Sequence, residues 1–265
     1  MKHIRTIINK EWSEVFKNRM VVMTMSLLPL IFTALPLLML ALTGESGTGA
    51  NLPAQSSGLP PGFLTACSGM NVNECMQVYL LNQFMILFMM MPLLIPTTIA
   101  AYSIVGEKTT RSLEPLLATP ISTLELLAGK SLAAAIPGVL ITYVSYGIFL
   151  LGTVFLKISP AVREYMISPT WSIGILVLGP LMAVIATMFA IFVSSRVSDP
   201  RVAEQVSGLV ILPLMLVLGA VLAGILIINV WFMGIAVLVC AAVAFALLHL
   251  GTVIFDRENI LTKWK

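Results

Sequence analysis

Residues 20–43 read MVVMTMSLLPLIFTALPLLMLALT, and this uninterrupted apolar stretch decides the fold class. A helix needs about 20 apolar residues to cross the hydrocarbon core of a bilayer. Six stretches reach that length, namely residues 20–43, 78–105, 131–156, 171–194, 206–228 and 230–255. The first is too long for a signal peptide, whose apolar region has only about 7 to 15 residues. We therefore expect an all-α integral membrane protein with six transmembrane helices.

The composition agrees with a membrane protein. The chain has 265 residues, of which 58% are hydrophobic and 10% charged, and its mean hydropathy is +1.00. Soluble domains carry about 25% charged residues. All 15 Lys and Arg and all 12 Asp and Glu lie outside the six stretches, and the net charge of +3 is too small to hold a nucleic-acid backbone. We expect the lipid bilayer as a partner and no nucleic acid.

The positive charges predict the orientation of the spans. Thirteen of the 15 Lys and Arg lie in the N-terminal segment, the second and fourth connections and the C-terminal tail. The other two, Lys157 and Arg163, lie in the third connection. Cytoplasmic segments of membrane proteins are enriched in Lys and Arg. Both termini are therefore expected in the cytoplasm.

Residues 44–77 form the predicted first external loop. They are rich in Gly, Ser, Pro and Asn, a composition that favours turns. Cys67 and Cys75 lie in this loop, on the oxidising side of the membrane, where a disulfide can form. The alternative is a pair of free thiols.

Residues 1–19 predict an amphipathic helix ahead of the first span. Apolar residues recur at helical spacing, namely Ile4, Ile7, Ile8, Trp12, Val15 and Phe16. The other face is polar and mainly basic, a pattern typical of a helix that lies in the headgroup plane. This interfacial helix either serves as a topology anchor only or also contacts a cytoplasmic partner.

The sequence contains no recognisable catalytic or metal site. Residues 124–131, LELLAGKS, end like a phosphate-binding loop, but Leu124 stands where the motif requires its first glycine. No His, Cys and acidic residues cluster with metal-ligand spacing. We expect no catalytic residue, no metal and no cofactor in this chain, which is not an enzyme by itself. His249 is the only Asp, Glu, Lys, Arg or His in a predicted span, whereas ion-driven carriers commonly place such residues inside the bundle. An ATP-independent secondary carrier, which could bind its ion with backbone carbonyls at broken helices, stays an alternative, and so does a non-transporting membrane assembly factor.

Residues 106–130, GEKTTRSLEPLLATPISTLELLAGK, form the longest predicted cytoplasmic connection. Two short helices are expected in it, residues 109–118 and 124–128. Thr119-Pro120 separates them, because a residue before proline avoids the helical region. Leucines stand beside charged residues here, which is typical of a surface that docks a partner.

Residues 107–120, EKTTRSLEPLLATP, followed by Glu125-Leu126 and Gly129-Lys130, resemble the signature loop of ABC-2 type transporter permeases, the membrane subunits of type V ABC exporters. The N-terminal helix and the six spans are also similar, so the resemblance implies one transmembrane domain over residues 1–265. It implies that loop 106–130 forms coupling helices that seat on a separate ATPase subunit. The residues that it assigns to ATPase coupling are Glu107, Arg111, Leu113, Glu114, Leu116, Leu117, Thr119, Pro120, Glu125 and Lys130.

The resemblance also implies an assembly and a task. Two copies of the ATPase would bind ATP and Mg, and a second permease copy would complete a homodimer in the plasma or inner membrane of a prokaryote. Because the predicted spans carry no formal charge, exported cargo is expected to be hydrophobic, amphiphilic or peptide-like. One departure concerns the last two spans: family members often carry a re-entrant helical hairpin at their external end, whereas residues 206–255 leave room only for a tight turn.

Overall fold

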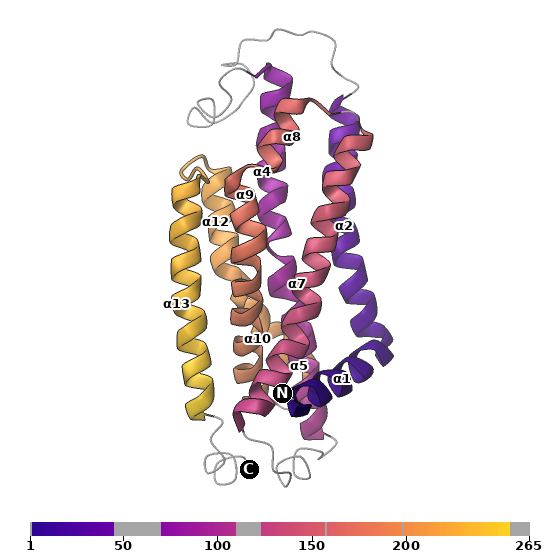
Figure 1. The fold of residues 1–265 in the computed structure, drawn as a ribbon, viewed down its shortest axis with the longest axis vertical. Helices are drawn as coiled ribbons and strands as arrows, with labels where there is room; N and C mark the ends of the chain where they lie inside the picture. Colours follow the sequence, from indigo (N-terminus) through magenta and orange to yellow (C-terminus); the bar gives the residue numbers. More distant parts are fainter. Residues whose placement is uncertain (1, 45–69, 110–122, 157, 198, 255–265) are drawn as a thin grey trace.

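The computed structural model describes residues 2–44, 70–109, 123–156, 158–197 and 199–254. In these ranges the chain forms an elongated bundle of helices without a strand (Figure 1). The elements, in chain order, are α1 (Lys2–Lys17), α2 (Arg19–Gly44), α4 (Val72–Phe88), α5 (Met91–Thr109), α7 (Thr123–Phe155), α8 (Pro160–Met166), α9 (Pro169–Ile173), the π-helix η3 (Gly174–Leu178), α10 (Gly179–Arg196), α11 (Pro200–Ser207), the 3₁₀ helix η4 (Gly208–Ile211), α12 (Leu212–Leu222) and α13 (Val230–Ile254).

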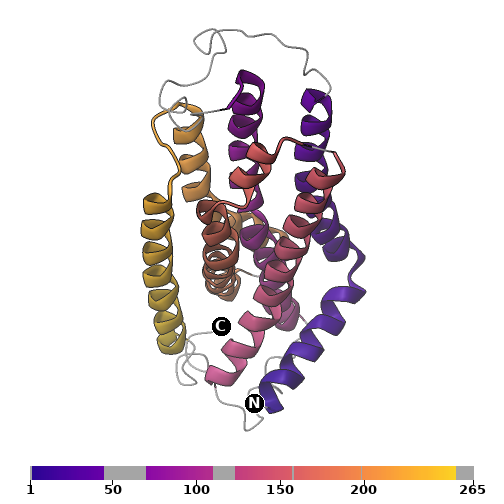
Figure 2. The ribbon, with the colours of Figure 1, turned by 45° about the horizontal axis from the view of Figure 1, so that its top comes forward.

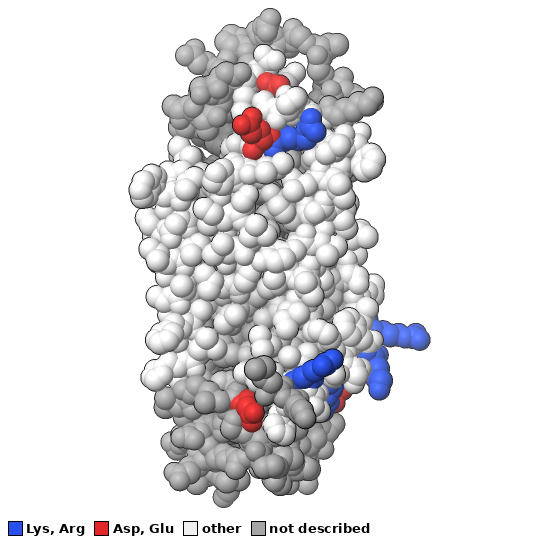
Figure 3. Space-filling model, in the orientation of Figure 1, with Lys and Arg blue, Asp and Glu red and all other residues white. Residues whose placement is uncertain are grey.

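The prediction of six membrane-spanning helices is confirmed. Six helical segments are long and apolar enough to cross a bilayer, namely Val21–Leu42, Asn73–Gly106, Glu125–Phe155, Pro160–Arg196, Pro200–Leu222 and Val230–Gly251. On the face shown in Figure 3, the described charges gather at the two ends of the bundle and leave an uncharged belt between them. That belt matches the hydrocarbon layer of a membrane.

The second span is built from two helices rather than one. α4 begins at Val72, ahead of the predicted start at residue 78, because the Glu74 carboxylate accepts a hydrogen bond from the Asn71 backbone N–H and caps the helix. α4 ends at Phe88, and α5 starts after a turn at Met89 and Met90. Pro92 has no N–H to give to the carbonyl four residues earlier, so the break falls where proline requires it.

The third connection is more structured than the predicted loop. Two short helices, α8 and α9, precede α10, and each begins with a Ser-Pro pair that places proline in the first helical turn. Val162 and Met166 of α8 and Trp171 of α9 are fully buried, so α8 and α9 pack into the core. The π-helix η3 follows directly and joins α9 to α10.

α7 is the central helix of the bundle. It contacts α1, α2, α5, α10 and α13, and Figure 2 shows it crossing the bundle from the end where α1 lies toward the opposite end. Two glycines allow close packing. A Cβ atom at Gly138 would lie 2.5 Å from Cγ of Pro96 on α5, and one at Gly152 would lie 2.6 Å from a Leu37 methyl on α2.

The Gly138→Ala variant is expected to be less stable than the wild type. Alanine favours a helix by about 1 kcal/mol over glycine, but overpacking against a rigid proline ring costs about 1–3 kcal/mol. Gly147→Ala is the matched control, because a Cβ atom there meets nothing within 4 Å in the same helix. Thermal unfolding in detergent should show a lower midpoint for Gly138→Ala than for Gly147→Ala. Equal unfolding midpoints of the two variants would show that α5 and α7 accommodate the added methyl group without a loss of stability.

The connection between the last two spans is short, as the sequence predicts. α12 ends at Leu222, and Gly224 takes a φ of 70°, which closes the helix C-terminus in the way that glycine allows. Residues 225–229 are not helical, and the Asn229 side chain caps α13 by accepting a hydrogen bond from the Phe232 N–H. The described residues therefore contain no re-entrant helical hairpin here.

Candidate functional site

The residues assigned to ATPase coupling fall into three groups. Seven of them lie in residues 110–122, outside the described part of the chain: Arg111, Leu113, Glu114, Leu116, Leu117, Thr119 and Pro120. Glu107 lies in the last turns of α5. Glu125 and Lys130 lie in α7, which begins at Thr123 and runs without interruption into the third span. The predicted separate helix 124–128 is therefore wrong: it is the first part of α7.

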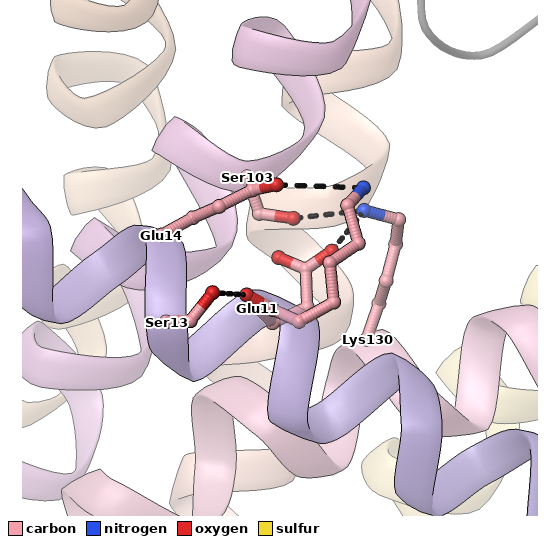
Figure 4. A network of polar contacts seen from close by, with 6 residues as sticks. Glu11, Ser13, Glu14, Ser103 and Lys130 are labelled. Atoms are coloured by element: carbon pink, nitrogen blue, oxygen red, sulfur yellow. Dashed lines mark hydrogen bonds and ion pairs between the residues drawn. The ribbon is translucent and has the colours of Figure 1, made fainter.

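Lys130 is buried in an ion pair that joins α7 to α1. Its Nζ donates to Oε1 of Glu11 at 2.7 Å and to Oγ of Ser103 on α5 at 2.9 Å (Figure 4). Both charged side chains are buried, at 7% exposure for Lys130 and 3% for Glu11. Three helices therefore meet at one ammonium group, next to the two ends of the segment predicted to bind the ATPase.

Glu11 is the residue that sequence reasoning missed. It lies one turn after Ile7 and one turn before Val15, and these are the most buried apolar residues of α1. A carboxylate within the apolar stripe of a helix indicates that it pairs with a buried cation on another element. The remaining predicted interfacial residues divide: Ile4, Ile8 and Trp12 are half-buried, whereas Phe16 is exposed. That α1 lies in the headgroup plane stays a prediction.

Trp12 makes a second link between α1 and α7. Its indole N–H donates to the backbone carbonyl of Ala133 at 2.9 Å. Pro137, four residues after Ala133, has no N–H, so this carbonyl lacks the partner that an uninterrupted helix would provide. The indole satisfies a carbonyl that the proline leaves unpaired, as neighbouring helices do for prolines in membrane spans.

Replacing Trp12 by phenylalanine is expected to cost about 1–3 kcal/mol, because the Ala133 carbonyl is left buried and unpaired. In a Pro137→Ala background the same replacement should cost much less, since the N–H of the new alanine can bond that carbonyl. Unfolding midpoints of the four proteins of this double-mutant cycle test the explanation. An equal loss in both backgrounds would mean that only the packing of the indole matters.

The first turns of α7 pack closely on both sides. A Cβ atom at Gly129 would lie 2.9 Å from a methyl of Ile7 on α1, and one at Gly251 on α13 would lie 2.9 Å from a methyl of Leu127. Together with the ion pair, these contacts join the start of α7 to α1, α5 and α13. The start of α7 is therefore packed against helices on both sides.

Two tyrosines of α7 form hydrogen bonds to the fourth span, one to α8 and one to η3. The Tyr143 hydroxyl donates to the Leu176 carbonyl at 2.9 Å, four residues ahead of Pro180, and the Tyr146 hydroxyl donates to the Met166 carbonyl at the end of α8 at 2.8 Å. The Tyr146 hydroxyl thereby bonds a carbonyl at a helix end, where intrahelical partners are missing. α7 thus connects α1 at one end to the fourth span at the other.

The described residues contain no group of three or more His, Cys, Asp and Glu side chains that could hold a metal ion. Cys75 is buried and disulfide-bonded, and Cys240 is a free thiol. Cys67 lies outside the described residues, so its pairing with Cys75 stays a prediction. His249 lies on the exposed side of α13.

Comparison with known proteins identifies the family to which this chain belongs. A family model described as "ABC-2 family transporter protein" matches residues 5–237. A search of curated proteins found no match. The matched range contains most of α1, the predicted coupling segment, five complete spans and the start of the sixth. Because that range covers most of the chain, this multi-pass membrane protein belongs to the ABC-2 family of transporter proteins, and its likeness to their permeases is confirmed.

Proposed function

We propose that this chain is the permease subunit of an ATP-driven exporter, and that a separate ATPase subunit docks on residues 106–130. The observation that carries the proposal is the buried Lys130, the last residue of that segment, which joins α1, α5 and α7. α5 leads into the segment and α7 leads out of it. A movement imposed there reaches two spans and the N-terminal helix together.

The mechanism is mechanical coupling. ATP binding closes the dimer of ATPase subunits, and the docked segment moves with them. The second and third spans tilt as a unit, because Gly138 and Pro96 hold α5 and α7 in close contact and the ion pair fixes α1 to both. The pathway opens across the axis of a homodimer of this chain.

The remaining parts of the assembly follow from the same proposal. ATP and Mg bind to the partner subunits, two per exporter, and this chain has no catalytic activity of its own. The protein lies in the plasma or inner membrane of a prokaryote with both termini in the cytoplasm. The cargo is hydrophobic, amphiphilic or peptide-like and leaves the cell.

We expect an ABC ATPase to be encoded next to this chain. Affinity purification of the tagged chain, from cells that express both proteins, tests the proposal. The ATPase should co-purify, and the complex should hydrolyse ATP while the tagged chain alone does not. Replacing the phosphate-binding lysine of the ATPase should abolish efflux. Efflux that continues with the inactive ATPase would instead support a secondary carrier, and an ATPase that never co-purifies would contradict the proposal.

A further inference from the structure

Two cations at the corner between α1 and α2 have no acidic partner among the described residues. Lys17 ends α1, Arg19 begins α2, and both side chains are exposed. The two acidic residues of α1, Glu11 and Glu14, are each paired with a different lysine. In Figure 3, cationic side chains project outward at the lower right, at the edge of the uncharged belt. The corner therefore presents positive charge that no described carboxylate balances.

This corner lies at the boundary of the first membrane span. The apolar span covers Val21–Leu42, so Arg19 precedes its first residue by two positions and Lys17 by four. At 1.5 Å per residue, the Cα atom of Arg19 is about 3 Å from the start of the span along the helix. Long cationic side chains at the ends of spans extend into the headgroup layer of the bilayer. Both cations are therefore within reach of the phosphates of that layer.

An exposed apolar surface continues from Arg19 along the same face of α2. Three apolar residues follow Arg19 at intervals of four, four and three residues, which places them on one face of the helix: Met23, Leu27 and Leu30. Their exposed fractions are 68%, 50% and 64%. α2 lies at the edge of the bundle, so this face points away from the other spans (Figure 1). The cationic group and the apolar stripe thus share one outward surface.

We propose that Lys17 and Arg19 bind the phosphate of an anionic phospholipid in the leaflet on the α1 side of the bundle. One acyl chain of this lipid lies along Met23, Leu27 and Leu30. A phospholipid joins a phosphate to long apolar chains, and this surface offers a partner to each part. Arginine suits the headgroup, because its planar N–H donors can bond two phosphate oxygens at once.

The charge of the corner favours a lipid over a second copy of this chain. A two-fold contact centred on the corner would bring the same two cations of each copy together, and like charges across an interface are unfavourable. The charge also selects among lipids. Phosphatidylglycerol carries a net negative charge, whereas the ammonium group of phosphatidylcholine cancels the charge of its phosphate. Two unpaired cations therefore favour phosphatidylglycerol.

Native mass spectrometry of the full chain, purified in detergent, tests the proposal. The chain is titrated with phosphatidylglycerol and with phosphatidylcholine that carries the same acyl chains, and the dissociation constants of the first bound lipid are compared. The wild type should prefer phosphatidylglycerol. Lys17→Gln together with Arg19→Gln should weaken phosphatidylglycerol binding by roughly thirtyfold, because each cation beside an anionic lipid contributes about fivefold. Binding of phosphatidylcholine should not change.

Arg196→Gln together with Arg201→Gln is the matched control. Both arginines are exposed, at the end of α10 and the start of α11, and their replacement removes the same charge at the same end of the bundle. This control should keep the preference for phosphatidylglycerol. An equal loss in both double variants would show only a general attraction between anionic lipid and a positive protein, and would overturn the site.

Two further measurements complete the test. Glycerol phosphate, which has no acyl chain, should not compete with phosphatidylglycerol, and effective competition would show a site for soluble anions instead of a lipid. The unfolding midpoint of the Lys17→Gln and Arg19→Gln variant in lipid-free detergent should equal that of the wild type, because both side chains are exposed. A lower dimer fraction of this variant at unchanged lipid affinity would assign the corner to a second copy and overturn the proposal. Because no ATPase is present, none of these outcomes bears on the docking of the ATPase.

Discussion

The Glu11→Ala variant is expected to lose about 3–5 kcal/mol of stability, the cost of leaving a buried charge without its partner. The ammonium of Lys130 would keep its hydrogen bond to the Ser103 hydroxyl but would lose the carboxylate that balances its charge in a buried position. For a chain of this size the midpoint of thermal unfolding in detergent should fall by roughly 6–20 °C. The loss should be accompanied by faster proteolysis of α1, because the ion pair is one of its main attachments to the bundle.

Glu14→Ala is the matched control. Glu14 lies on the same helix and pairs with Lys10 at 3.7 Å, but its side chain is 54% exposed. Such surface pairs contribute about 0–1 kcal/mol, so its midpoint should stay near that of the wild type. Replacing both members of the buried pair, with Glu11→Leu and Lys130→Met together, should recover much of the lost stability. If Glu11→Ala unfolds at the wild-type midpoint, the ion pair does not hold α1 in place.

The number of spans could be predicted from sequence, but their ends could not. Apolar length sets how many helices cross the bilayer, and all six segments agree. A helix, however, continues past the apolar stretch until a cap ends it. α11 begins at Pro200 because Asp199 accepts a hydrogen bond from the Arg201 N–H, and α7 begins at Thr123, ahead of the uncharged apolar stretch that starts at residue 131. Hydropathy therefore placed Glu204 and Lys130 in connections, although both lie on helices that pack in the bundle.

The site was predicted only in part, for a related reason. The composition of residues 106–130 indicates a docking surface, but Glu11 and Lys130 lie 119 residues apart, and nothing in one sequence pairs them. The same holds for Trp12 and the carbonyl of Ala133. The sequence indicates one member of each contact separately. Glu11 is a carboxylate within the apolar stripe of α1, and Pro137 lies inside a helix, where it leaves a carbonyl without its backbone partner. Only the fold brings the members of each contact together.

Reversing two charges in the docking segment should have the largest effect on function. The change is Arg111→Glu together with Glu114→Lys, which leaves the net charge unchanged while it exchanges the positions of opposite charges. Like charges placed against each other across an interface cost several kcal/mol, so the ATPase should bind at least about a hundredfold more weakly. ATP-driven transport should be lost, while the unfolding midpoint of the chain itself should not change.

The dissociation constant between the purified ATPase and this chain in nanodiscs tests the central claim most directly. The account predicts that the wild type and an Arg163→Gln and Glu164→Gln control, altered at the opposite end of the bundle, bind the ATPase equally. It predicts that the variant with Arg111→Glu and Glu114→Lys loses that binding. Unchanged affinity of this variant for the ATPase, together with unchanged ATP-driven efflux, would contradict the claim that residues 106–130 couple this permease to its energy source.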